Sequence, residues 1–239
     1  MIDPPAPLPW DPQDETAEER VQRALWISAD TLDLSGLFLR RLPESLQQLT
    51  SVTDLNLDGN NLAEVPEWLT DLTSLTELWL SSNELAELPE RLGDLSRLTH
   101  LWIFGNDLTR LPESMRNLAG LEFLGARNNQ FEELPDWIGE LTSLAVLQLC
   151  GNRLTRLPDS IGNLTDLEEL TLEYNDLTEL PASLGNLVDL TELRLRDNDL
   201  TELPPSLSSL TGLQWLSVAD NRLDELPDWA AALAGEQRS

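Results

Sequence analysis

The chain has one cysteine, Cys150, and one histidine, His100, the side-chain types best suited to act as a nucleophile and its general base. Such a pair works only when the sulfur and a ring nitrogen approach to about 3 Å. A lysine nucleophile is excluded, because all 15 basic side chains are arginine. One histidine and one cysteine are too few for a zinc site, and the Asp197-Asn198-Asp199 stretch lacks the spacing of a calcium loop. Whether the chain could be a cysteine enzyme therefore depends on the elements that carry Cys150 and His100.

Those elements follow an internal repeat of 23 residues, with the frame LxxLxLxxNxLxxLPxxLxxLxx. Asparagines recur at this spacing, at positions 60, 83, 106, 129, 152, 175, 198 and 221. Prolines recur at the same spacing, from Pro43 to Pro227. Nine units begin near Ala29, Val52, Leu75, Leu98, Leu121, Leu144, Leu167, Leu190 and Leu213. A repeat this regular predicts one elongated stack of equivalent units.

The LxL alternation in each unit places leucines on one face of a short strand and their neighbours on the other face. One unit is too small to bury its leucines, so parallel units are expected to stack into a continuous core, with strands about 4.8 Å apart. The asparagine amide is expected to donate to and accept from adjacent turns. In this arrangement Cys150 and His100 lie on the order of 16 Å apart. They cannot form a catalytic pair, so the sequence predicts no enzyme, no cofactor and no metal site.

The frame resembles that of leucine-rich repeat proteins, of the 23-residue type whose units contain Leu-Pro, as in the Ras-suppressor-like and plant intracellular Ras-group repeats. The resemblance covers roughly Ala29 to Leu233. It implies an α/β solenoid, a leucine-rich repeat horseshoe with parallel β-strands on the concave face and short irregular or helical convex segments. The shared residues are structural and specify the fold rather than a function, so a small GTPase or a signalling or scaffold protein is suggested as partner by analogy only.

The ends of the chain read as caps around the repeats. The expected organisation is an N-terminal segment and helical cap at 1–28, leucine-rich repeats at 29–233 and a C-terminal tail at 234–239. Thr16 and Glu19 form a capping-box pattern before apolar residues at helical spacing. This pattern predicts a short helix over the edge of the first strand, with Trp10 or Trp26 folded over it. The final stretch predicts an alanine-rich helix that stops near Gly235.

The composition limits the partners. A formal net charge of −28 repels phosphate backbones and anionic lipid headgroups, so neither nucleic acid nor a membrane is an expected partner. No stretch of about 18 apolar residues occurs. A single cysteine fits a reducing compartment, so we expect a cytoplasmic protein. The absence of lysine, with abundant alanine, leucine, glycine and arginine, suggests a GC-rich bacterial genome. We expect a monomer rather than a homodimer.

Large side chains gather where the frame leaves the concave face free. Trp79 and Trp102 are expected to be direct neighbours on adjacent strands. Around them the sequence places His100, Phe104, Phe123, Val146, Gln148 and Cys150. Exposed apolar patches of this kind usually mark an interaction site, so we expect the partner to bind here. The alternative is that the aromatic residues only stabilise the sheet, by roughly 0.2–1 kcal/mol for each cross-strand pair.

Two small residues, Gly125 and Ala126, follow in the fifth unit, where most units carry larger side chains. They predict a notch in the concave face that would receive a side chain of the partner. Its walls would be Trp102, Phe104 and Gln148. The alternative is that Phe131, which replaces a frame leucine, fills this volume from inside.

Charged residues border the aromatic residues on both sides. Asp54, Asp58 and Glu77 precede them, and Arg127, Arg194 and Arg196 follow among Glu169, Glu173 and Glu192. A charged rim around an apolar centre is typical of interfaces. The arginines would alternatively neutralise neighbouring carboxylates. Tyr174 and Trp215, together with Arg194 and Arg196, are expected to form a second, smaller contact point.

The sequence therefore favours a non-catalytic protein-interaction module that binds its partner through the concave aromatic residues, with His100 and Arg127 as polar contacts. One alternative is an accessory or substrate protein whose exposed tryptophan, histidine or cysteine is modified by a partner enzyme. Another is a homodimer that covers the aromatic residues with a second copy.

Overall fold

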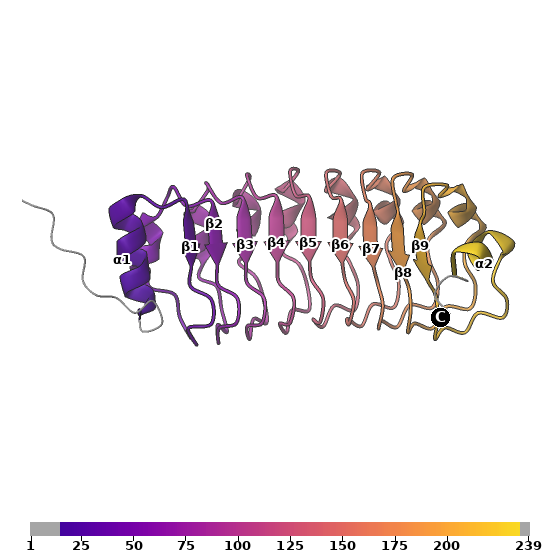
Figure 1. The fold of residues 1–239 in the computed structure, drawn as a ribbon, viewed down its shortest axis with the longest axis horizontal. Coiled ribbons are helices and arrows are strands. Elements are labelled where there is room, and N and C mark those ends of the chain that lie inside the picture. The colour runs from indigo at the N-terminus through magenta and orange to yellow at the C-terminus, as the bar shows by residue number, and fades with distance from the viewer. Residues whose placement is uncertain (1–14, 235–239) are drawn as a thin grey trace, which may run out of the picture.

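The nine predicted units form one elongated solenoid in a computed structural model, which describes residues 15–234 (Figure 1). Each unit contributes one strand of three residues. The strands are β1 (Thr31–Asp33), β2 (Asp54–Asn56), β3 (Glu77–Trp79), β4 (His100–Trp102), β5 (Phe123–Gly125), β6 (Val146–Gln148), β7 (Glu169–Thr171), β8 (Glu192–Arg194) and β9 (Trp215–Ser217). They pair in parallel, in chain order, in a single open sheet. The predicted leucine-rich repeat solenoid is confirmed.

The register of the sheet follows the 23-residue period. Each residue pairs with the equivalent residue of the next unit, as Leu78 does with Leu101 and Trp79 with Trp102. The central leucine of every strand points into the core, and Leu101 is fully buried. A slip by one residue would turn all these leucines outward, so burial fixes the register. The residues on either side of the central leucine face outward, and we call this outer surface the sheet face.

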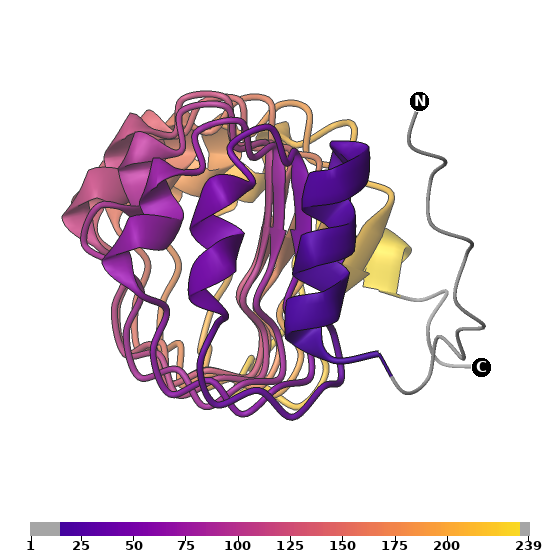
Figure 2. The same ribbon diagram turned by 90° about the vertical axis from the view of Figure 1, so that its left-hand side faces the viewer.

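Short 3-10 helices return the chain on the side opposite the sheet (Figure 2). They are η1 (Glu44–Gln48), η2 (Glu67–Asp71), η3 (Leu92–Asp94), η4 (Glu113–Asn117), η5 (Asp136–Glu140), η6 (Asp159–Asn163), η7 (Ala182–Asn186) and η8 (Pro205–Ser209). Most begin directly after the repeated proline, as η4 does after Pro112, whose φ of −65° suits the extended entry into the helix.

The repeated asparagines form the predicted ladder. Asn106 donates from Nδ2 to the carbonyl oxygens of Leu80 and Ile103, at 3.0 and 3.1 Å, and its Oδ1 accepts the N–H of Leu85 at 3.1 Å. Each such amide therefore pairs backbone groups of its own unit and of the preceding unit, which would otherwise be buried without partners. The first unit has Leu37 in the asparagine position, and its own backbone N–H is bound by Asn60.

The N-terminal end of the sheet is covered by α1 (Ala17–Ile27). The predicted capping box is confirmed, since Thr16 Oγ1 accepts the N–H of Glu19 and the Glu19 carboxylate accepts the N–H of Thr16. The buried face of α1 includes Val21 and lies against β1. The expectation that Trp26 folds over this edge is wrong: Trp26 is 81% exposed. Trp10, the other residue expected there, lies outside the described residues.

The C-terminal end is covered by α2 (Asp228–Ala234), as its alanine-rich sequence predicts. Gly235, the expected stop, lies outside the described residues. On the convex side Trp137 is buried, and Trp68 and Trp229 pack partly buried against the core. No helix in the described part of the chain is long and apolar enough to cross a membrane.

Candidate functional site

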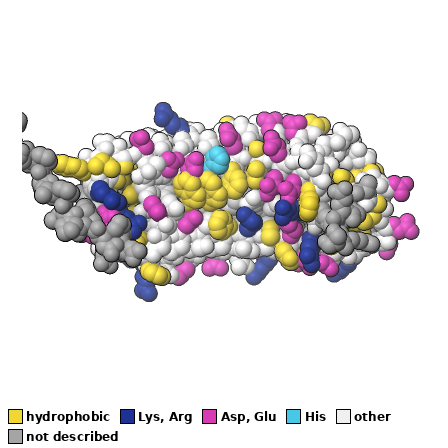
Figure 3. All heavy atoms as spheres, viewed as in Figure 1, with side chains coloured by type: hydrophobic (Ala, Val, Ile, Leu, Met, Phe, Trp, Pro, Cys, Tyr) yellow, Lys and Arg dark blue, Asp and Glu magenta, His cyan; other side chains and the backbone are white. Residues whose placement is uncertain are grey.

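Four rings stack across β3, β4 and β5 on the sheet face. The indoles of Trp79 and Trp102 lie with centroids 4.5 Å apart and planes 4° from parallel. The Phe123 ring lies 5.1 Å from Trp102, and the His100 ring lies 5.5 Å from Trp102 and 5.9 Å from Phe123. We call these four residues and Phe104 the aromatic patch. All five side chains are half-buried, and apolar groups gather over the central strands in Figure 3.

The repeat itself positions these rings. Trp79 and Trp102 occupy the same frame position on neighbouring strands, and His100 and Phe123 share another frame position. Because parallel strands lie about 4.8 Å apart, rings at equivalent positions are brought to stacking distance. The predicted neighbour relation of the two tryptophans is therefore confirmed. Their role in binding a partner stays a prediction.

Phe104 follows Trp102 beyond the end of β4, and its ring faces a cation. The guanidinium carbon of Arg127 lies 6.0 Å from the centroid of the Phe104 ring, within the range of a cation–π contact. Arg127 is exposed and makes no ion pair in the described part of the chain. Its charge is thus available at the rim of the aromatic patch.

The predicted notch at Gly125 is filled. A Cβ atom on Gly125 would lie 2.9 Å from Cε1 of Phe123 and 3.4 Å from Cδ1 of Trp102, so the two rings already cover this position. Phe131 and Ala126 are fully buried on the core side. Gly125 therefore seats the Phe123 ring against Trp102, and it does not open a hole for a side chain of the partner.

Val146, Gln148 and Cys150 continue the sheet face beyond the aromatic patch, and all three are half-buried. The Gln148 amide donates to the Glu169 carboxylate at 2.8 Å. Burial is the main cause that raises the pKa of the Cys150 thiol above its ordinary value; Glu173 raises this pKa further, whereas nearby arginines lower it. The thiol is therefore protonated at neutral pH and a poor nucleophile.

Cys150 and His100 remain apart, as the repeat predicts. His100 on β4 is in register with Phe123 on β5 and then with Val146 on β6, and Cys150 lies four residues beyond Val146, past the end of β6. The His100 ring nitrogen Nδ1 instead lies 2.9 Å from Oγ1 of Thr99. No group of three or more potential metal ligands occurs among residues 15–234.

The arginines beyond β7 are engaged by neighbouring carboxylates. Arg194 forms ion pairs with Glu173, at 3.7 Å, and with Glu192. Arg196 pairs with Asp197 and Asp220, at 3.0 and 2.8 Å. Both Arg194 and Arg196 therefore neutralise nearby carboxylates, as the alternative interpretation expects.

Tyr174 and Trp215, the expected second contact point, are 54% and 45% exposed. No ring contact joins them in the described part of the chain. Their proposed role in partner binding stays a prediction.

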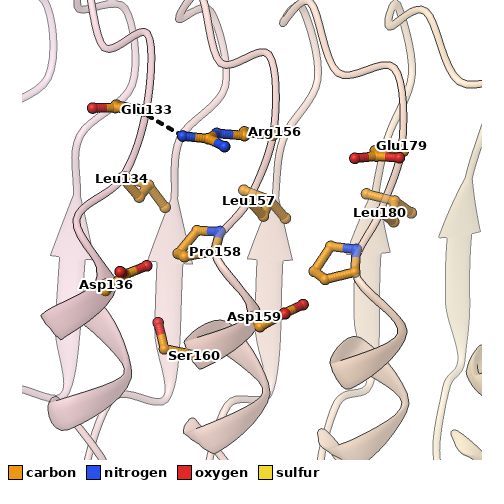
Figure 4. A pocket seen from close by; sticks show the side chains of 11 residues that line it. Glu133, Leu134, Asp136, Arg156, Leu157, Pro158, Asp159, Ser160, Glu179 and Leu180 are labelled. Carbon is orange, nitrogen blue, oxygen red and sulfur yellow. Dashed lines mark hydrogen bonds and ion pairs between the residues drawn. The ribbon is translucent and has the colours of Figure 1, made fainter.

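Several hollows on the described part of the chain were not predicted from the sequence, and two of them lie on units that contribute to the aromatic patch or border it. The larger, of about 710 Å³, lies between return segments after β5, β6 and β7 (Figure 4). Its rim carries an ion pair of 3.3 Å between Arg156 and Glu133, beside Asp136, Asp159 and Glu179. The smaller, of about 340 Å³, lies on the sheet face over β1, β2 and β3, where Trp79 forms one wall. The Leu-Pro frame gives no signal for either, because it specifies core residues rather than surface relief.

Two family models match the chain. The leucine-rich repeat region model matches residues 89–177, and the Leucine Rich Repeat model matches residues 74–95 and 189–210. A search of the curated proteins found no match.

Several solved structures share the fold. YopM, a leucine-rich effector protein from Yersinia pestis, is 30% identical over 88% of this chain and 67% of its own, with a TM-score of 0.65. The ectodomain of the plant membrane receptor kinase GASSHO1/SCHENGEN3 from Arabidopsis thaliana, in complex with CASPARIAN STRIP INTEGRITY FACTOR 2, is 31% identical over 85% of this chain, with a TM-score of 0.69. The plant peptide hormone receptor RGFR1 in complex with RGF2 is 28% identical over 81% of this chain, with a TM-score of 0.68.

The chain spans only 28% and 36% of the two plant receptor chains, but two thirds of YopM. Three observations lead to the same assignment: the nine parallel units with their repeated asparagines, the two matching family models, and the sequence identity to YopM. The chain belongs to the leucine-rich repeat family.

Proposed function

We propose that the chain is a non-catalytic module that binds a partner protein on its sheet face through the aromatic patch. The observation that carries the proposal is the run of stacked rings over three adjacent strands, at positions where the leucine frame requires no aromatic residue. Rings already held in place offer a large apolar area at little further entropic cost, which is the property of binding hot spots.

The relatives support an interaction role. Both plant receptors carry the same fold and are solved in complex, one with CASPARIAN STRIP INTEGRITY FACTOR 2 and the other with RGF2. In the present chain the proposed anchors are Trp79, Trp102, Phe104 and Phe123, with His100 and Arg127 as polar contacts at the rim. A chain with a single cysteine suits a reducing compartment, so the proposed setting is the bacterial cytoplasm.

The absence of a catalytic role rests on the side chains themselves. Cys150, the single thiol, has a raised pKa and no imidazole within reach, because His100 lies two strands away. A thiol with a raised pKa and no base at about 3 Å lacks two of the usual means by which a cysteine nucleophile is activated.

The test is a capture experiment with three tagged proteins in a lysate of the source organism. The wild-type chain should retain a partner that the Trp102→Ala/Phe104→Ala variant loses. Trp26→Ala is the matched control, because Trp26 is 81% exposed and lies on α1 at the N-terminal end of the solenoid, outside the aromatic patch. It should capture as the wild type does. Equal recovery of every bound protein by all three baits would reject the proposal.

A further inference from the structure

The stack of rings ends at β3, where one face of Trp79 is left open. Trp102 covers the other indole face at 4.5 Å. On the β2 side the residue in register with Trp79 is Asn56, whose side chain is much shorter than an indole. The outer part of this indole face therefore forms one wall of the hollow of about 340 Å³ over β1, β2 and β3.

Carboxylates from three adjacent strands also line this hollow, those of Asp33, Asp54 and Glu77, together with Thr31, Leu32 and Asn56. Asp54 accepts hydrogen bonds from the hydroxyls of Thr53 and Thr76, at 3.1 and 3.4 Å. Asp54 and Glu77 make no ion pair with an arginine in the described part of the chain. Arg20 approaches the edge of the sheet and donates to the main-chain oxygen of Asp33 at 3.0 Å.

The pKa of the neighbouring Asp58 is also affected by the negative charge of this region. Burial raises its pKa most, and the nearby Asp33 raises it further, while hydrogen bonds from Ser81 act in the opposite direction. On the far side of the aromatic patch the situation differs, since Arg194 and Arg196 are paired with acids there. Asp54 and Glu77, which have no arginine partner in the described part of the chain, thus lie on the β1–β3 side of the sheet face, where acidic groups are seen beside the apolar centre in Figure 3.

An open aromatic face beside carboxylates attracts an organic cation. A guanidinium stacks on an indole and forms paired hydrogen bonds to a carboxylate, and an ammonium does so less completely. A metal ion does not fit this wall, and no cluster of three metal-ligating side chains occurs among the described residues.

We propose that the partner places an arginine or lysine side chain in this hollow, against Trp79, Asp54 and Glu77, and an apolar side chain on the neighbouring rings of the aromatic patch. The inference rests on the proposed function and adds the chemistry and the direction of the bound segment. The hollow and the Trp102–Phe123 rings are about two and a half strand spacings apart, roughly 12 Å. An extended segment covers this distance in about four residues, with its basic end toward β1.

The probe is a random linear peptide library displayed on phage and selected on the full wild-type chain. Selected peptides should be enriched in arginine or lysine about four residues from an apolar residue. Their Kd would then be measured on Asp54→Asn/Glu77→Gln, which keeps the shape of the hollow and removes two charges. We expect about tenfold weaker binding. Unfolding curves would show that the variants remain folded.

A charge control separates the hollow from general attraction to an acidic protein. Glu64 and Glu202 precede the Leu-Pro or Val-Pro step, are exposed and make no ion pair among the described residues, so Glu64→Gln/Glu202→Gln removes the same charge elsewhere. This control should change the Kd by less than about twofold.

The outcomes distinguish the two proposals. The first informative case is a set of peptides that bind the wild type and no longer bind Trp102→Ala/Phe104→Ala. If these peptides contain no enriched basic residue, or if both charge variants change their Kd equally, the inference is overturned and the proposed function stands. Peptides unaffected by Trp102→Ala/Phe104→Ala, or no selected peptide at all, would count against both.

Discussion

The indole rings of Trp79 and Trp102 lie 4.5 Å apart and within 4° of parallel on neighbouring strands. This stack uses one face of each ring for contact with the protein itself. The ring edges and the outer face of Trp79 remain for a partner, so we expect the partner on the patch and a cation on its β2 side.

If the patch serves binding, its rings should contribute little to folding. Trp102→Ala removes cross-strand contacts from a half-buried side chain, so we expect a loss of about 1–2 kcal/mol in the free energy of unfolding, measured in urea. Leu101→Ala, one residue away and fully buried, should cost about 2–5 kcal/mol. Equal losses would mean that the aromatic residues are there for stability.

Removal of one side-chain amide from the asparagine ladder should lower the free energy of unfolding. Asn106→Ala leaves the carbonyl oxygens of Leu80 and Ile103 and the N–H of Leu85 without their partner, which should cost about 1–3 kcal/mol. Asn117 is exposed at the end of η4, and Asn117→Ala should change stability by less than about 0.5 kcal/mol. Thermal or urea unfolding would compare the two. Indistinguishable curves would show that the ladder is not needed.

Glycines in the 3-10 helices allow neighbouring units to pack closely. A Cβ on Gly185 would lie 2.5 Å from the backbone oxygen of Ser206 in the next unit, so Gly185→Ala must push two units apart. We expect a loss of about 1–3 kcal/mol in unfolding free energy. Gly120 has nothing within 4 Å of its Cβ position, and Gly120→Ala should leave stability unchanged or slightly raised. A neutral Gly185→Ala would contradict this packing.

Asp58 should make stability depend on pH. Its pKa is raised above 3.8, mainly by burial, so the folded protein holds this proton more tightly than the unfolded chain does. The charged form therefore costs stability at neutral pH, and this cost disappears as the pH falls through the folded-state pKa toward 3.8. Asp58→Asn keeps an oxygen that accepts the Ser81 N–H.

Asp58→Asn should thus be more stable than the wild type at pH 7, and the difference should shrink on acidification. Urea unfolding of both proteins over a series of pH values would measure it. A difference that stays constant with pH would show that titration of Asp58 is not its cause.

The sequence predicted the solenoid, the register and the tryptophan pair, because a strict period of 23 residues fixes which side chains are neighbours. It could not predict where side chains turn within that register. The missing side chain of Gly125 predicts either a notch or a volume filled from inside, whereas in the structure the Phe123 ring turns over Gly125 from the sheet face. The apolar character of Trp26 predicts that it folds over the edge of the sheet, whereas Ala17, Val21 and Ala24 are the buried residues of α1 and Trp26 is exposed.

The hollow beside Trp79 is a second feature whose side-chain arrangement the repeat does not predict. The acidic residues before the patch were visible in the sequence as a charged flank. That they share a hollow with an open indole face depends on side-chain lengths in three strands, and no repeat frame encodes this.

The most direct test of the central claim is the Kd of the purified captured partner for the wild-type chain and for Trp102→Ala. Removal of a central anchor should weaken binding by about thirtyfold or more, with Trp26→Ala unchanged. A Kd for Trp102→Ala within about twofold of the wild type would place the binding site elsewhere and contradict the account.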